Sequence, residues 1–134
     1  MVSTADDYLR FGEMLLGRGK LNGARILTPR CVGLMTSDWL TPHQRNVEVF
    51  GRKFFAGQGY GLGVSVTDKP ALQEEQVGYS SAGSFGWSGA YGTSWLADPA
   101  EGMNLIYMSQ LASTQVTISQ HANLMASAYE AIDD

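Results

Sequence analysis

Cysteine is scarce in this sequence, and its scarcity excludes two kinds of site. The 134 residues contain a single cysteine, Cys31, so neither an intrachain disulfide nor a cysteine-based zinc site can form. Because Cys31 lies beside the apolar Val32, we expect it to be a small buried side chain. We predict neither a bound metal nor a cofactor for this chain.

Charge is also scarce, and the basic residues do not gather. Charged residues make up 16% of the sequence, below the usual share of about a quarter in soluble domains. The formal net charge is −4, and the nine basic residues form no cluster larger than the one at Arg18–Lys20. A surface that follows a phosphate backbone needs more positive charge than this. We therefore expect no nucleic acid partner.

Long apolar runs are absent as well. None approaches the roughly 18 residues of a membrane span. The first residues, MVSTADD, lack the basic and then apolar layout of a signal peptide. For the chain as given we expect no membrane span, and we favour a soluble, cytoplasmic protein.

The N-terminal region has helical signals. Ser3 and Thr4 are good capping residues, and apolar side chains then recur at helical spacing until two glycines interrupt them, which predicts a helix over 4–17. Thr28-Pro29 combines a cap with a proline in the first turn. It begins a second predicted helix that ends near Ser37.

The central and C-terminal parts contain the strand signals. Alternating apolar residues predict a strand over Tyr60–Val66, Gln76–Ser81 is a weaker candidate, and Trp87–Ala97 has strand character in its second half. The turn residues at 98–102 join that half to a buried strand in Met103–Leu111, which makes a hairpin.

The order of these elements predicts a single α+β domain over 1–134. Apolar residues from Val116 to Ile132 recur at helical intervals, which indicates a long C-terminal helix. We expect an antiparallel sheet of about three strands, flanked by the N-terminal helices and this long helix. The expected division is helical over 1–37, loop over 38–58, strands over 59–111 and helix over 114–134.

Glycine is concentrated in GSFGWSGAYGT, residues 83–93, together with three aromatic residues. Glycine weakens an ordinary core strand, so one interpretation is a strand edge that a ligand can approach closely, with aromatic walls. The other interpretation is a glycine-rich hairpin loop with ordinary aromatic packing, and composition alone favours this second one.

The same segment resembles the third conserved element of penicillin-recognising serine hydrolases, of the class C β-lactamase and esterase type. That element is Lys-Thr-Gly in the β-lactamases and Trp-x-Gly in many related esterases, and here it reads Trp87-Ser88-Gly89. Four further stretches resemble the family in the same order, namely Val2–Phe11, Leu27–Arg30, Tyr60–Gly63 and the Asp98-Pro99 turn before an apolar strand. The resemblance implies the C-terminal part of a β-lactamase-like fold.

The resemblance also implies roles for individual residues. The residue after the motif glycine, Ala90, would hold the oxyanion with its backbone N–H, and Gly89 would let the substrate lie against the strand. Trp87 would stand where the β-lactamases have lysine, and this favours esters over β-lactams as substrates. Ser88 and Tyr91 would face the pocket or its rim.

Two elements of the family are missing from this sequence. None of the serines has a lysine three residues on, as Ser-x-x-Lys requires, and none of the tyrosines begins Tyr-x-Asn. An oxyanion donor without a nucleophile cannot perform covalent catalysis. We therefore expect this chain alone to be inactive.

Two functions remain open from the sequence. The first is a fragment or remnant of a serine hydrolase whose parent cleaves esters or β-lactams. The second is a non-catalytic binding domain that associates with itself, because missing sheet neighbours would leave an open edge and an apolar face. We predict a homodimer or a higher oligomer, and a complementary chain that supplies Ser-x-x-Lys is the alternative partner.

Overall fold

A computed structural model of the chain describes residues 3–49, 51–55, 57–68, 80–112 and 114–132. Four helices lie in these ranges, and they are α1 (Ala5–Leu16), α2 (Pro29–Met35), α3 (Pro42–Arg45) and α4 (Thr114–Glu130). The weak strand candidate at 76–81 lies mostly outside the described residues, and its last two residues are not in a strand.

The predicted α+β class is confirmed. The main sheet has five antiparallel strands in the order β5 (Gln58–Tyr60), β6 (Ser65–Thr67), β7 (Phe85–Ser88), β8 (Ser94–Asp98) and β9 (Met103–Tyr107). Two short hairpins stand apart from it, formed by β1 (Lys20–Leu21) with β2 (Ala24–Arg25) and by β3 (Glu48–Val49) with β4 (Arg52–Lys53). The predicted number of about three strands was therefore too low.

The additional strands come from two hairpins, one within the segment predicted as a single strand and one at the glycine-rich segment. Tyr60–Val66 is not one strand, because the chain turns between β5 and β6, where the Gly61 amide donates to the Val64 carbonyl at 2.7 Å. Gly63 follows with a φ of +91°, which glycine adopts without strain. Trp87–Ala97 likewise folds back on itself, so that β7 and β8 pair.

Residues 38–58 were expected to form a loop, yet they contain α3 and the β3–β4 hairpin. The single turn of α3 is stabilised by a capping box. Thr41 accepts a hydrogen bond from the Gln44 amide, and the Gln44 side chain accepts one from the Thr41 amide. Pro42 at the first helical position adds to this preference. A periodicity search over longer windows misses so short an element.

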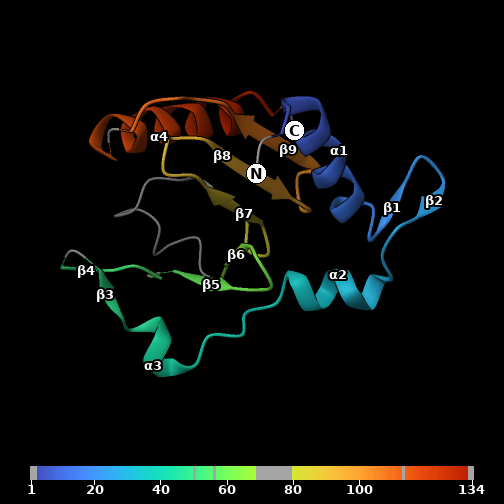
Figure 1. The fold of residues 1–134 in the computed structure, drawn as a ribbon, viewed down its shortest axis with the longest axis horizontal. Coiled ribbons are helices and arrows are strands. Elements are labelled where there is room, and N and C mark those ends of the chain that lie inside the picture. Colours follow the sequence, from blue (N-terminus) through green and yellow to red (C-terminus); the bar gives the residue numbers. More distant parts are fainter. Residues whose placement is uncertain (1–2, 50, 56, 69–79, 113, 133–134) are drawn as a thin grey trace.

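Helices α1 and α4 pack on opposite faces of the β8–β9 end of the sheet (Figure 1). On one face, Trp95 of β8 contacts Tyr8 and Phe11 of α1, with ring centroids 5.3 and 5.6 Å apart. On the other face, Tyr107 donates a hydrogen bond to Gln120 of α4. Because side chains alternate along a strand, these two sets of contacts belong to different faces.

The core lies mainly between α1, α2 and the sheet. Its buried members are Met14, Leu15, Val32, Val64, Val66, Phe85, Trp95 and Ala97. The expectation for Cys31 was wrong, because this residue is exposed in the first turn of α2, where the neighbouring Val32 faces the core. None of the helices in the described part of the chain has the length and apolarity needed to cross a membrane.

Candidate functional site

The glycine-rich segment forms the hairpin between β7 and β8. The strand pairing ends where Ser88 lies opposite Ser94. Beyond it, the Gly89 amide donates to the Thr93 carbonyl at 2.7 Å, and the Gly92 amide donates to the Gly89 carbonyl at 3.0 Å. These bonds enclose a three-residue loop, 90–92, whose last position has a φ of +77°. Three-residue hairpin loops favour glycine at this last position, and the sequence has Gly92 there.

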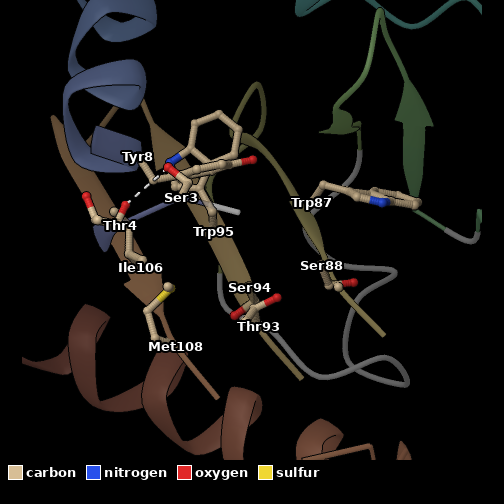
Figure 2. Close-up of a pocket in the computed structure, with 11 residues that line it drawn as sticks. Ser3, Thr4, Tyr8, Trp87, Ser88, Thr93, Ser94, Trp95, Ile106 and Met108 are labelled. Carbon is tan, nitrogen blue, oxygen red and sulfur yellow. Dashed lines mark hydrogen bonds between the residues drawn. The ribbon is translucent and has the colours of Figure 1, made fainter. Parts of the chain in front are cut away.

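A pocket of about 280 Å³ lies beside this hairpin, between the start of α1 and the adjoining ends of β7, β8 and β9 (Figure 2). Its lining residues are Ser3, Thr4, Tyr8, Trp87, Ser88, Gly89, Thr93, Ser94, Trp95, Ile106 and Met108. The structure thus brings together three of the five predicted site residues.

The other two predicted residues lie outside the lining. Ala90 and Tyr91 occupy the exposed hairpin loop, and 64% of Tyr91 is accessible to solvent. The Ala90 amide makes no hydrogen bond to any described residue. Ala90 is the second residue of the turn that runs from Gly89 to Gly92. The hydrogen bond of such a turn joins the carbonyl of the first residue to the amide of the fourth, so it leaves the amide of the second residue unpaired.

Two tryptophans stand on neighbouring strands at the pocket. Trp95 is buried against Tyr8 and forms the pocket floor, whereas the Trp87 ring points away from them in Figure 2. Trp87 instead makes edge-on contacts with Tyr60 and Phe54, whose ring centroids are 4.8 and 6.2 Å away. Its ring therefore joins the pocket rim to a cluster of three aromatic rings from Phe54, Phe55 and Tyr60.

The lining is electrically neutral. It contains no aspartate, glutamate, lysine, arginine or histidine, and its polar groups are hydroxyls and backbone. The Thr4 hydroxyl already caps α1, because it accepts from the Asp7 amide at 3.2 Å. The described lining places no base beside Ser88 or Ser94. The described residues also contain no group of three acidic, histidine or cysteine side chains that could hold a metal ion.

Sequence reasoning missed most of the lining. Tyr8, Trp95 and Ile106 come from three different elements, and only the sheet register places Trp95 between Trp87 and Ile106. Met108, which lies just beyond the end of β9, lines the pocket and is 54% exposed. The β8–β9 hairpin could have been used to find two of these residues, because its register pairs Trp95 with Ile106 on one face of the sheet.

A second polar group lies at the opposite end of the same strands. Asp98 is fully buried at the end of β8. Its carboxylate accepts hydrogen bonds from the amides of Ser81, Ala100 and Glu101 at 3.0, 2.9 and 3.4 Å, and also from the hydroxyl of Tyr129 in α4.

These donors govern the titration of Asp98. Burial alone would raise its pKa, but the bonds from Tyr129, Ser81 and Ala100 outweigh burial and hold the pKa below its ordinary value. The Tyr129 pKa moves upward, because burial and the adjacent Asp98 carboxylate both oppose a phenolate. Asp98 is therefore a fixed anion that joins the chain before β7, the β8–β9 turn and α4.

A protein of Mycobacterium tuberculosis strain H37Rv, Rv1367c, is 47% identical over 108 residues. The match covers 81% of this chain and 27% of the relative, so the chain spans about a quarter of that protein's length. The corresponding protein of strain CDC 1551, MT1414, has the same identity and coverage and is described as uncharacterized.

Solved structures share the fold at low sequence identity. Simvastatin synthase (LovD) from Aspergillus terreus superimposes with a TM-score of 0.66 at 20% identity, over 91% of this chain and 33% of that one. EstCE1, a hydrolase with promiscuous acyltransferase activity, gives 0.63 at 24% identity, over 90% and 29%. A 6-aminohexanoate-dimer hydrolase homologue from Bacillus anthracis gives 0.59 at 22% identity, over 98% and 30%.

The fold is thus a partial β-lactamase-like fold that corresponds to about a third of each solved structure. The family model for beta-lactamase matches residues 1–130, nearly the whole sequence. This chain belongs to the beta-lactamase family.

Proposed function

We propose that this chain forms the acyl-binding wall of a β-lactamase-like serine hydrolase that cleaves esters, with the nucleophile supplied from outside the chain. The observation that carries the proposal is the position of Trp87, Ser88 and Gly89, which line a neutral pocket beside an unbonded amide. Family membership supplies the reaction type, and the pocket supplies the preference for esters.

The Ala90 amide is the proposed oxyanion donor. It lies next to the pocket, and the loop leaves it without an acceptor among the described residues. Gly89 keeps the strand clear beside it, so a carbonyl group can approach the backbone. A donor held ready for developing negative charge contributes about 3–4 kcal/mol in comparable acyl-transfer sites.

Ester preference follows from the lining. A β-lactam antibiotic carries a carboxylate, and binding it in a small pocket calls for a cation or several strong donors. The described lining has no cation, and the family resemblance assigns Trp87 to the position where the β-lactamases have lysine. Tyr8, Trp95, Ile106 and Met108 instead offer apolar surface to an uncharged acyl group.

The proposed covalent cycle needs a serine that this chain lacks. The oxygen of that serine attacks the ester carbonyl, the bond to the alkoxy group breaks, and the alcohol leaves with the serine proton. Water then cleaves the acyl-enzyme to release the acid and restore the serine. The hydroxyls of Ser88 and Ser94 face the pocket without a base, so the isolated chain should not perform the first step.

Two measurements test this proposal. First, the purified chain is treated with a fluorophosphonate and with p-nitrophenyl butyrate, and we expect neither covalent labelling nor turnover. Either signal from the chain alone would show that it carries its own nucleophile, contrary to the proposal.

Second, binding is followed by tryptophan quenching with p-nitrophenyl butyrate and with mono-p-nitrophenyl succinate, its negatively charged counterpart. The neutral ester should bind at least tenfold more tightly. Gly89→Ala should weaken its binding, whereas Gly33→Ala, the same change on α2 where an added Cβ meets open space, should not. Equal or tighter binding of the charged ester would contradict the neutral-acyl assignment.

A non-catalytic, self-associating domain is the second candidate. The observation that favours it is a pocket with no base in its lining, together with a sheet that corresponds to only part of the solved structures. Such a domain would bind a second copy of itself or a complementary chain that supplies the nucleophile.

A further inference from the structure

The side chain of Trp95, which forms the pocket floor, has a single polar group, and a residue outside the lining pairs with it. The indole N–H of Trp95 donates to the side-chain oxygen of Asn104 at 2.8 Å. Only 4% of Trp95 is exposed, and a buried indole needs an acceptor because it can only donate. Asn104 is not among the pocket-lining residues. It can therefore affect a bound ligand through the ring that it holds.

The register of the sheet places Asn104 beside that ring. In the β8–β9 pair, Trp95 lies opposite Ile106, and Ala97 lies opposite Asn104. Residues directly opposite each other share a face, and alternate residues along a strand share it too, so all four side chains lie on the face that α1 covers. The buried Ala97 has only a methyl group. The space next to the indole is thus left to the asparagine.

The amide of Asn104 is itself fixed in one orientation by α1. Its nitrogen donates to the Leu9 carbonyl at 2.9 Å, and a Cβ at Gly12 would lie 2.4 Å from the same nitrogen, so the helix leaves just enough room for it. If the amide were turned over, its NH2 group would face the indole N–H and its oxygen would face the Leu9 carbonyl. Both contacts would then oppose like groups, and the amide oxygen therefore stays on the side of Trp95.

The other neighbours of Trp95 hold the ring less specifically. The rings of Tyr8, Phe11 and Phe85 lie 5.3, 5.6 and 5.9 Å from it, at interplanar angles of 80°, 49° and 71°. Aromatic contacts are favourable over a range of such angles, so they allow the ring several positions. The directional bond to Asn104 distinguishes one end of the indole from the other, and it selects a single position for the floor.

We propose that Asn104 is a positioning residue that sets the depth of the acyl pocket by holding the Trp95 indole in place as its floor. The proposal rests on the proposed function, because it takes this pocket to be the acyl site. A short acyl chain ends above the ring, whereas a longer one must displace the ring and break its bond to Asn104. The substrate class is therefore neutral esters with a short acyl chain.

The first test measures acyl-chain preference by equilibrium dialysis with p-nitrophenyl butyrate and p-nitrophenyl hexanoate. The unaltered chain should bind the butyrate about tenfold more tightly, since the floor has no room for two further methylenes. Asn104→Leu has a similar volume but no acceptor, and it should bind the two esters about equally. An unchanged ratio in this variant, or a preference of the unaltered chain for the hexanoate, would overturn the proposal.

Tyr129→Phe is the control for a purely structural effect. It also removes a hydrogen bond, at the Asp98 end of β8, but it leaves Trp95 and Asn104 untouched. It should lower stability and keep the preference for the butyrate. If it lost the preference as Asn104→Leu does, the ratio would report stability alone and the proposal would be wrong.

The second test needs no ligand. The indole N–H of Trp95 is identified in NMR spectra by its loss in Trp95→Phe, and its exchange with solvent should be about tenfold faster in Asn104→Leu than in the unaltered chain. The indoles of Trp39 and Trp87 should exchange as before. Equal exchange of the Trp95 indole in both proteins would show that Asn104 does not hold the ring.

Trp95→Phe tests the same bond from its other partner, and it remains informative if Asn104→Leu fails to fold. It should also lose the preference for the butyrate. Adding Asn104→Leu to it should change the ratio no further, because the bond is already gone. A further change would mean that Asn104 acts by another route, contrary to the proposal.

Failure of the pocket and failure of the positioning role give different results. If the unaltered chain binds neither ester, the proposed function is wrong. If it binds both and Asn104→Leu keeps the ratio, the pocket stands and only the role of Asn104 is wrong.

Discussion

The two ends of the β7–β8 hairpin contrast sharply in how their polar groups are used. At one end, Asp98 is buried and accepts four hydrogen bonds from three separate parts of the chain. At the other end, the loop beyond Ser88 is exposed and leaves the Ala90 amide free of any described partner. The polar groups at the Asp98 end are used in hydrogen bonds within the fold, whereas the Ala90 amide at the loop end can still donate to a ligand.

This difference suggests a division of labour along two strands. A site must be held in place by residues whose own positions are fixed. The Asp98 end supplies that rigidity, since it ties β8 to α4 and to the segment that leads into β7. If the two ends differ in stability as they differ in bonding, substitutions at the Asp98 end should cost far more than substitutions in the exposed loop.

The largest effect should follow from removal of the buried carboxylate. Asp98→Ala would remove a fully buried carboxylate that accepts from the amides of Ser81 and Ala100 and from the Tyr129 hydroxyl, and each lost hydrogen bond to a charged group costs about 1.5–3 kcal/mol. We expect a loss of about 3 kcal/mol or more in the free energy of unfolding, measured by urea titration. The control is Asp6→Ala, an exposed residue in the first turn of α1, which should cost less than about 1 kcal/mol. Similar losses in both variants would contradict the structural role of Asp98.

The next effect concerns α1, which forms one wall of the pocket. A Cβ on Gly12 would overlap the amide of Asn104. That amide cannot move freely, because it donates to the Leu9 carbonyl at 2.9 Å and accepts from the Trp95 indole at 2.8 Å. Gly12→Ala should therefore destabilise the chain by about 1–3 kcal/mol, as overpacking does.

Gly33→Ala is the matched control for that change. Gly33 lies in α2 with open space around the Cβ position, so alanine there should be neutral or stabilising by up to about 1 kcal/mol. Thermal unfolding of the two variants side by side measures the difference. Equal melting temperatures would show that α1 does not seat on the sheet through Gly12 and Asn104.

A smaller effect should follow from loss of one donor to Asp98. Tyr129→Phe removes the hydroxyl and should cost about 1–2 kcal/mol at neutral pH. Because the folded pKa of Asp98 lies below the unfolded value, its contribution is present above the unfolded pKa and is lost as the pH falls through the folded pKa. The variant raises the folded pKa, so its stability should fall less steeply in acid.

Urea midpoints between pH 7 and pH 3 check this sign. The difference in urea midpoint between the unaltered chain and Tyr129→Phe should become smaller as the pH falls. Tyr129 adds a change in alkali, since a raised pKa means stability that is present below the ordinary tyrosine pKa of about 10 and lost above it. The phenylalanine variant should lack this alkaline loss. Parallel pH curves would contradict the coupling of the two side chains.

These contrasts mark what the sequence could predict and what it could not. Local signals worked where the structure is local. Thr4 and Thr28 cap the helices that they were expected to begin, and Trp87-Ser88-Gly89, singled out by its sequence, lines a pocket. The α+β class also followed from the order of helices and strands.

Prediction failed where distant residues decide the outcome. The donors of Asp98 include Tyr129, 31 residues away, and no spacing rule joins them. The exposure of Cys31 depends on which side of α2 faces the core, and seven residues are too few to show a periodicity. The number of strands was underestimated because a turn at Gly63 divides Tyr60–Val66, although its apolar residues alternate as they would in a single strand.

The smallest effect on stability is expected at the loop end. Ala90 is the second residue of a hydrogen-bonded turn, a position where proline is well tolerated. Because the Ala90 amide has no described partner, Ala90→Pro should change the free energy of unfolding by less than about 0.5 kcal/mol. The matched change Leu96→Pro, within β8, should unfold the chain, since it removes a ladder amide. If Ala90→Pro destabilised the chain as much as Asp98→Ala does, the loop would be a structural element, and its amide would not be free to serve as the proposed oxyanion donor.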